Sequence, residues 1–302
     1  MRWLLGLLSA WLCLSCVTPT PAEDPVAHDD DARSAEHDDL EKLLSLSRGT
    51  PDEPAILGRL ASLEEQQARL AQRQAQERAV LAAEASQRGS APVHDAQQAE
   101  AKRLELEAES LRRSAITRLD AFANRWPASK ETPKALLLLA ELQREQHDDA
   151  AADAALDTLV RNYGTTPLAA DAHLARAERL FEKAELEAAI AEYDLAAKAD
   201  RFLAYATYKR AWCELNLSRF QPALDDFARA MGMGDSKIAN EAAKDWVRAW
   251  AMAPGSTAQG AKDALTPKTT PAGLKKLLAR LAAAYRELGR PDESAAADAL
   301  AR

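Results

Sequence analysis

Residues 203–231 read LAYATYKRAWCELNLSRFQPALDDFARAM, and this stretch is the clearest copy of a unit that recurs along the chain. Its central alanine, Ala223, lies 34 residues after Ala189, and Ala189 follows Ala152 and Ala115 in steps of 37. Bulky residues keep a fixed offset of four positions after these alanines, namely Leu119, Leu156, Tyr193 and Phe227. Small residues let helix backbones approach closely while bulky ones fill the gaps between them. A period of this length therefore predicts stacked helix hairpins.

We expect an all-α fold, in which residues 95–302 form a superhelical array of such hairpins. Its second unit opens at Pro133, turns at 147–149 and returns to about Asn162. The third and fourth units cover about 168–198 and 203–231. Residues 96–126 fit either one long helix or a degenerate first hairpin, and Arg103, in the place of a small residue, favours a cap-like unit.

The first sixteen residues have the pattern of an export signal. An apolar run from Trp3 to Leu14 follows Arg2, and about twelve residues are too few for a permanent membrane span. We therefore expect residues 1–15 to be a removable signal peptide. Cys16 behind a small residue resembles a bacterial lipoprotein cleavage site, which implies lipidation at Cys16; an ordinary cleaved signal and an uncleaved anchor are the alternatives. Val17, rather than aspartate, then implies the outer membrane, facing the periplasm.

Residues 16–54 show no periodicity and are strongly acidic. Between 17 and 64, twelve acidic residues stand against four basic ones, and prolines interrupt the segment. Such a stretch buries too little apolar surface to offset its ordering entropy, so we expect a disordered tether with a short helix at 39–46. The clusters around His28 and His37 could suggest a metal site, but a solvated linker is favoured because nothing would fix the ligand geometry.

A helix with a coiled-coil seam is expected over residues 55–86. Apolar and glutamine residues alternate there in steps of four and three, which is the coiled-coil spacing. The oligomerisation contacts predicted from this seam are Leu60, Leu63, Gln67, Leu70, Gln74 and Leu81. The alternatives are a lone solvated helix and a helix that folds back on the repeats. Residues 87–92 then break the helix.

Composition narrows the function further. A net charge of −8 and a pI near 5.3 argue against nucleic acid as a partner. Once the signal is removed and Cys16 is lipidated, Cys213 remains alone, so no intramolecular disulfide forms and Cys213 is expected to be a small, semi-buried hydrophobe. No Gly-rich phosphate loop and no nucleophile–histidine arrangement stands out, so we expect no catalysis, no cofactor and no metal site.

Three stretches carry a family resemblance. Residues 208–224 (YKRAWCELNLSRFQPAL), 241–251 (EAAKDWVRAWA) and 281–295 (LAAAYRELGRPDESA) resemble periplasmic tetratricopeptide-repeat lipoproteins of myxobacteria, including those of the adventurous gliding-motility apparatus. The resemblance covers about residues 113–302. In architecture, a signal, a glutamine-containing coil and 37-residue repeats are also similar to the coordinator of the Tol–Pal system, which trimerises through its coil and regulates a peptidoglycan synthase.

These resemblances imply a scaffold that binds cell-envelope proteins along the first helix of each unit. Carried onto this chain, that surface is a groove formed by Leu137, Glu141, Leu174, Glu178, Phe181, Tyr205, Tyr208, Trp212 and Leu215. Aromatic anchors beside carboxylates suit a peptide with apolar and basic residues. The alternative is that the aromatic side chains of residues 205–212 pack beneath the helix that contains Trp246 and Trp250.

Overall fold

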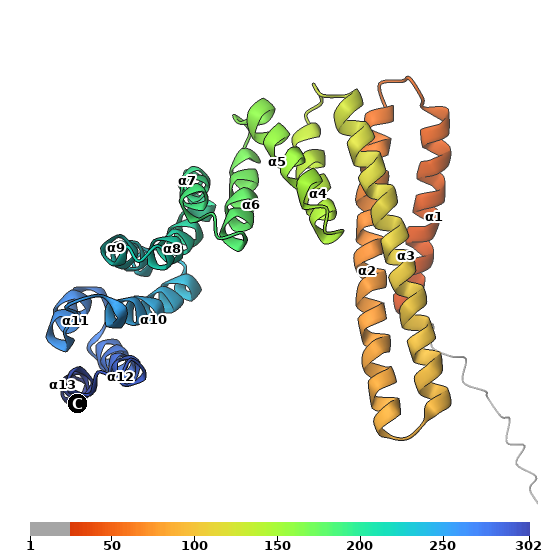
Figure 1. Ribbon diagram of the computed structural model, residues 1–302. Coiled ribbons are helices and arrows are strands. Elements are labelled where there is room, and N and C mark those ends of the chain that lie inside the picture. The colour runs from red at the N-terminus through yellow and green to blue at the C-terminus, as the bar shows by residue number, and fades with distance from the viewer. Residues whose placement is uncertain (1–24) are drawn as a thin grey trace, which may run out of the picture.

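The computed structural model describes residues 25–302, with side chains from residue 33 onward. This part of the chain contains thirteen α-helices, one short 3-10 helix and no strand, so it is an all-α helical-repeat superhelix (Figure 1). The predicted signal peptide, Cys16 and the start of the predicted tether lie outside the described residues. None of the described helices combines the length and the apolar character needed to cross a membrane.

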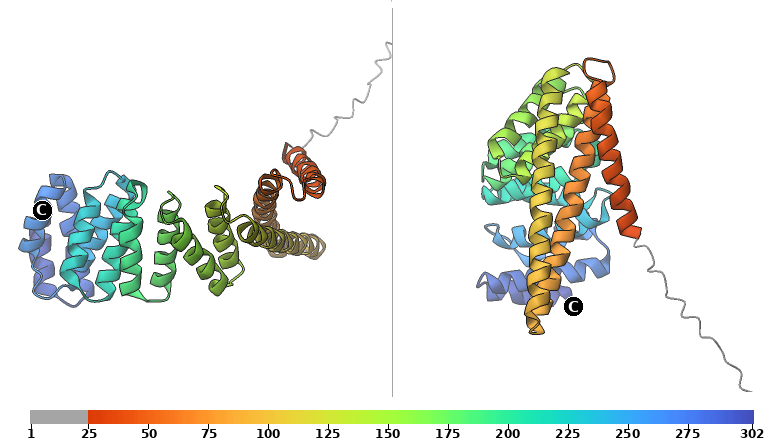
Figure 2. Two further views of the ribbon diagram at one scale, coloured as in Figure 1. Left: turned by 90° about the horizontal axis from the view of Figure 1, so that it is seen from above. Right: turned by 90° about the vertical axis from the view of Figure 1, so that its right-hand side faces the viewer.

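Three long helices lie side by side at one end of the molecule (Figures 1 and 2). They are α1 (Pro25–Leu46), α2 (Glu53–Gln87) and α3 (Ala91–Arg125). The turn between α2 and α3 contains Gly89 at φ 72°, a backbone conformation that suits glycine. Small residues at helical spacing line the α2 side of the contact with α3, and Ala61, Ala68, Ala71 and Ala75 are buried. These alanines let the two helices approach closely along much of their length.

Five helix hairpins follow, which we number units two to six. Their first and second helices are α4 (Thr132–Glu145) and α5 (Asp149–Tyr163); α6 (Ala169–Glu182) and α7 (Leu186–Ala196); α8 (Asp200–Asn216) and α9 (Phe220–Met231); α10 (Ser236–Met252) and α11 (Ala258–Leu265); and α12 (Pro271–Glu287) and α13 (Pro291–Ala301). The 3-10 helix η1 (Thr266–Lys268) joins the last two hairpins. The expected boundaries of units two, three and four agree with the structure.

The residues that define the sequence period form the interior of the array. All four repeat alanines and the four bulky residues that follow them are buried. Cys213 is also fully buried, and burial raises the pKa of its thiol to about 12. This confirms the expectation that it is a packing residue, since a protonated buried thiol is a poor nucleophile.

A second periodic feature lies in the turns between the two helices of each unit. The residues with positive φ are His147, Ala184, Ser218, Gly255 and Gly289, in alternating steps of 37 and 34 residues. The residue after most of them donates its N–H to the carbonyl five positions earlier, as Glu185 does to Leu180 at 2.9 Å. This is a helix C-terminal motif in which a left-handed residue satisfies the last carbonyls, and it makes the units equivalent in geometry.

The non-glycine residues in these turns give a stability prediction. Ala184 has φ 59°, a conformation disfavoured for residues with a Cβ. We expect Ala184→Gly to raise the free energy of unfolding by about 0.5–1 kcal/mol, because relief of the left-handed strain exceeds the added chain entropy. The matched control is Ala188→Gly, at an exposed position inside α7, which should lower the same quantity by a similar amount. Urea titrations of both variants measure this, and a loss of stability in Ala184→Gly would contradict it.

Three expectations about the N-terminal third need correction. The segment predicted as a disordered tether contains α1, whose described side chains at 33–46 pack along α2. Residues 91–125 form one long helix rather than a degenerate hairpin, so the array of hairpins begins at α4. The predicted coiled-coil helix is present as α2, but its main partner is α3 of the same chain.

Candidate functional site

The predicted groove residues lie on the first helices of three consecutive units, which contact one another in order along the array. α4 carries Leu137 and Glu141. α6 carries Leu174, Glu178 and Phe181, and α8 carries Tyr205, Tyr208, Trp212 and Leu215. The structure therefore brings most of the predicted set to one side of the repeat array, but it assigns different roles to its members.

A cleft of about 300 Å³ lies between α4 and α6, with α5 contributing to its lining. Three of the predicted residues line it: Leu137, Glu141 and Glu178. Its remaining lining is mixed, with Ala140, Ala152, Leu156 and Ala175 as apolar members and Arg144, Arg179 and Glu182 as charged ones. A recessed surface that combines apolar area with polar groups is the usual form of a binding site, and this cleft has five apolar and five charged lining residues.

Glu178 connects this cleft to the aromatic residues of units three and four. Its carboxylate accepts hydrogen bonds from the Tyr193 hydroxyl at 2.7 Å and from Lys209 Nζ at 2.9 Å. The Lys209 ammonium lies 4.3 Å from the centroid of Phe181 and 5.9 Å from that of Tyr205. Burial, followed by the charge of Glu178, raises the pKa of Tyr205 to about 12. This part of the predicted groove is thus an internal cage in which Lys209 supplies the cation.

Glu141 lines this cleft with a carboxylate whose charge Arg69 and Arg144 compensate only in part. Burial, together with the nearby carboxylates of Glu145 and Asp171, raises the pKa of Glu141 despite the opposing charge of Arg69. Arg69 Nη2 lies 3.7 Å from the Glu141 carboxylate, which is an ion pair without a hydrogen bond. A cation brought to this edge of the cleft would stabilise the charged form of Glu141.

The predicted aromatic anchors Tyr208 and Trp212 on α8 are partly exposed and also pack against the C-terminal core. Tyr208 and Trp212 are half-buried and contact the fully buried ring of Phe227, at centroid distances of 5.8 and 5.9 Å. The Tyr208 hydroxyl donates to Asp245 at 2.6 Å. Leu215 is buried in the C-terminal core, so its assignment to a binding groove is wrong. Contact with α9 and α10 makes these aromatics mainly structural.

A larger cleft, which the sequence did not reveal, lies between the N-terminal hairpin and α4. It has a volume of about 700 Å³ and shares Leu137 and Glu141 with the first cleft. Its apolar members include Leu119, Phe122 and Leu138, and its charged edge includes Arg59 and Lys134 from two different elements. This cleft is not evident from the sequence, because the heptad pattern of residues 55–86 predicts a separate coil. The two clefts flank α4 and share Leu137 and Glu141.

The predicted oligomerisation residues divide into three groups. Leu60 and Leu63 are fully buried within the chain and cannot form intermolecular contacts, so that part of the prediction is wrong. Gln67, Leu70 and Gln74 line a space shared with α1, and Leu81 is exposed. The seam therefore exists, but residues of the same chain cover most of it.

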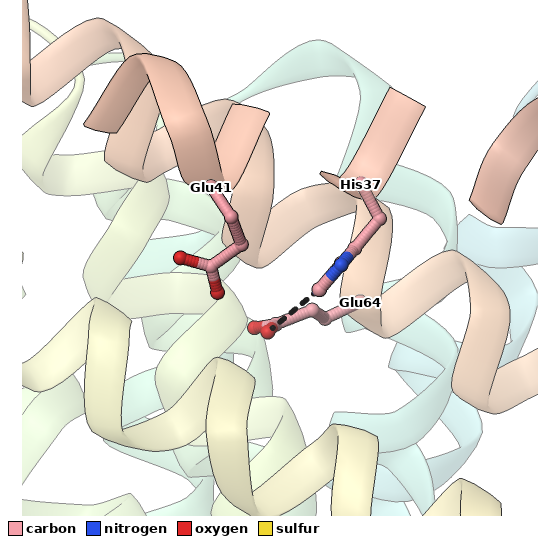
Figure 3. A group of neighbouring side chains, drawn as sticks. All are labelled: His37, Glu41 and Glu64. Atoms are coloured by element: carbon pink, nitrogen blue, oxygen red, sulfur yellow. Dashed lines mark hydrogen bonds and ion pairs between the residues drawn. The ribbon is translucent and has the colours of Figure 1, made fainter. Parts of the chain in front are cut away.

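One cluster resembles a metal-binding set. His37 and Glu41 on α1 and Glu64 on α2 place one potential ligand atom each within 4.8 Å of one another, and their side chains point together (Figure 3). The His37 Nε2 atom lies 3.4 Å from Glu64. However, Arg118 Nε lies 3.0 Å from both oxygens of Glu64, and its Nη2 atom contacts Glu41. Arg118 thus already compensates both carboxylates, and the cluster joins α1 to the hairpin as an ion-pair network.

Similarity to known proteins is found among solved structures. No protein-family model matches the sequence, and a search of curated proteins finds no match. Among solved structures, a tetratricopeptide repeat protein from Parabacteroides merdae is 15% identical over 74% of this chain and 77% of that chain, with a TM-score of 0.43. BtubC from P. vanneervenii is 17% identical over 79% of this chain and 89% of that chain, with a TM-score of 0.38. The repeat assignment therefore rests on the helix hairpins and turns of this chain itself.

Proposed function

We propose that this protein is a non-catalytic scaffold of the cell envelope that binds other proteins beside α4. Helical-repeat arrays provide extended concave surfaces for protein partners. The observation that supports the proposal best is the pair of clefts that meet at Leu137 and Glu141, each lined by both apolar and charged residues. An amphipathic segment of a partner, with apolar residues toward Leu137 and a basic residue toward Glu141, suits this surface.

Site-specific photo-crosslinking tests this proposal in the native envelope. A photoreactive amino acid in place of Leu137 should give a discrete covalent adduct with a partner protein. The same photoreactive residue in place of Glu105, which is exposed on α3 and lines neither cleft, is the control position. Addition of Glu141→Lys should reduce the adduct at position 137, because it reverses the charge at the shared edge. Equal adducts at both positions, or none at position 137, would contradict the proposal.

The cellular location is part of the same proposal. The apolar run at 3–14 followed by Ser15-Cys16 supports export and lipidation, and Val17 supports the outer membrane. We expect the protein to fractionate with the outer membrane and to be extracted from it by detergent. Cys16→Ser should release the protein from the membrane or block its processing. Wild-type protein found free in the periplasm with an unmodified N-terminus at Val17 or later would contradict lipidation.

The resemblance to gliding-motility lipoproteins supports an envelope or motility complex as the setting. The alternative, a Tol–Pal-type coordinator, depends on a coil that trimerises. In this chain, α2 pairs instead with α3, and this weakens the architectural argument for that alternative. Adducts captured at position 137 would distinguish the two, since a peptidoglycan synthase or a Tol protein is expected only for the coordinator.

A further inference from the structure

We infer that the larger cleft, between α2 and α4, holds the partner segment as an amphipathic helix. This helix places an acidic side chain beside Lys134, a basic side chain beside Glu141, and apolar side chains between them. The inference rests on the proposed function and deepens it, since it gives the conformation and the charge order of the partner segment.

The larger cleft has the length of a short helix. Its lining runs along α2 over residues 54–69 and along α4 over residues 131–141. At 1.5 Å per residue these stretches extend about 22 Å and about 15 Å, which corresponds to about three to four helical turns. α3 contacts both of these helices, and its buried Leu119 and Phe122 complete the lining (Figure 1).

A segment bound in this cleft has to satisfy its own backbone hydrogen bonds. Residues 25–302 contain no strand whose edge could pair with an extended peptide. Among the lining residues, only Ser62 and Gln66 have uncharged polar side chains. A helix bonds its backbone groups internally and presents side chains to such a lining, so a helix is favoured over an extended segment.

Lys134 defines the acidic position of the partner helix. It is exposed on α4 and lines the larger cleft. Within the described part of the chain, no ion pair or hydrogen bond to its ammonium group forms, and Glu131, one turn earlier, does not pair with it. Arg59 adds positive charge from the wall formed by α2, although Glu36 already accepts from it at 2.8 Å. A carboxylate of the partner would supply the countercharge that Lys134 lacks.

Glu141 defines the basic position. Arg69 lies 3.7 Å from its carboxylate, but Arg69 also pairs with Glu65 of its own helix. The charge of Arg69 is therefore divided between two carboxylates that line the same cleft. An ammonium or guanidinium group of the partner would complete the compensation of Glu141.

The spacing of these two positions gives the expected pattern of the partner helix. Lys134 and Glu141 are seven residues apart on α4, so they lie on one face, with Leu137 and Leu138 between them. A partner helix that packs along α4 has the same rise per residue. Its acidic and basic residues are thus about seven positions apart, and apolar residues three or four positions from each contact the two leucines.

Crosslinking from two positions of α2, in the complete protein in its native envelope, measures the conformation of the bound segment. Ala55 and Gln66 are exposed, line the larger cleft but not the smaller one, and are eleven residues or about 16 Å apart. A photoreactive amino acid at each position should capture partner residues about eleven apart, because packed helices advance equally. Peptide mass spectrometry of the adducts measures this spacing. Captured residues about five apart would indicate an extended segment, at about 3.3 Å per residue, and would overturn the inference.

Charge reversal tests the pairing with Lys134. Lys134→Glu should reduce the adduct at position 55 at least fivefold, because it places a carboxylate beside the acidic residue of the partner. The matched control is Lys130→Glu, which makes the same charge change at an exposed residue that lines neither cleft. Replacement by lysine of the partner's acidic residue between the two captured positions should restore the adduct in Lys134→Glu. Equal adduct yields from Lys134→Glu and Lys130→Glu, or no recovery with the lysine-substituted partner, would overturn the inference.

The proposed function and this inference can fail separately. Leu137 lines both clefts, whereas Ala55 and Gln66 line only the larger of the two. An adduct at position 137 without adducts at positions 55 and 66 would retain partner binding beside α4 and overturn only the helix in the larger cleft. No adduct at any of the three positions would overturn both.

Discussion

Phe227→Ala should lower the free energy of unfolding of the repeat array by about 3–5 kcal/mol, the usual range for truncation of a fully buried aromatic residue. Phe227 is fully buried and lies against the rings of both Tyr208 and Trp212. Its loss would leave a cavity where α8, α9 and α10 meet. Thermal and urea unfolding of the purified variant measure the effect.

Trp212→Ala is the informative companion to that experiment. Trp212 is only half-buried, so its truncation should cost clearly less stability than Phe227→Ala. It is also one of the residues that sequence analysis assigns to the binding groove. A loss of stability equal to that of Phe227→Ala would show that Trp212 is entirely a core residue. An unchanged melting temperature would instead show that the contact between Trp212 and Phe227 does not contribute to the stability of the fold.

Arg210→Met should have the second largest effect, a loss of about 3 kcal/mol, because the buried carboxylate of Asp226 then keeps only the exposed Arg229 as a partner. Asp226 is buried and accepts from Arg210 Nε at 2.6 Å and from Nη2 at 2.7 Å. This pair joins α8 to α9, and the remaining partner of Asp226, Arg229, is largely exposed. Urea titration measures the change.

Two controls separate the buried pair from ordinary surface charge. The double variant Arg210→Met/Asp226→Leu should recover most of the lost stability, because no charge is then left buried. Asp194→Asn removes the exposed second partner of Arg210 and should cost less than about 1 kcal/mol. A double variant less stable than Arg210→Met alone would contradict this account of the pair.

The candidate site was only partly predictable. Leu137, Glu141 and Glu178 could be placed from the repeat register, because helix geometry fixes which positions of a first helix share a face. The register does not say whether a neighbouring helix covers that face. For this reason Leu215, at an equivalent spacing, proved to be a buried core residue. Tyr208 and Trp212 proved to be partly buried and packed against the same core. The larger cleft was missed because ten of its sixteen lining residues come from α2 and α3.

The sequence by itself determined the all-α class, the period of 37 and 34 residues, the interior positions of the array and the break at 87–92. These follow from local spacing, since a repeated unit must present the same small and bulky residues to each neighbour. Only the tertiary structure decided what covers the seam of α2. A heptad pattern shows that one face of a helix will be covered, but it does not distinguish another copy from another segment of the same chain.

Helix α1 shows the physical reason most clearly. Its acidic composition predicts disorder, because the residues within the segment offer no means of offsetting its ordering entropy. The compensation comes from Arg59 and Arg118, which lie 23 and 77 residues from their partners Glu36 and Glu41. Pairings over such separations depend on how the hairpin brings distant positions together, and local sequence patterns contain no record of that.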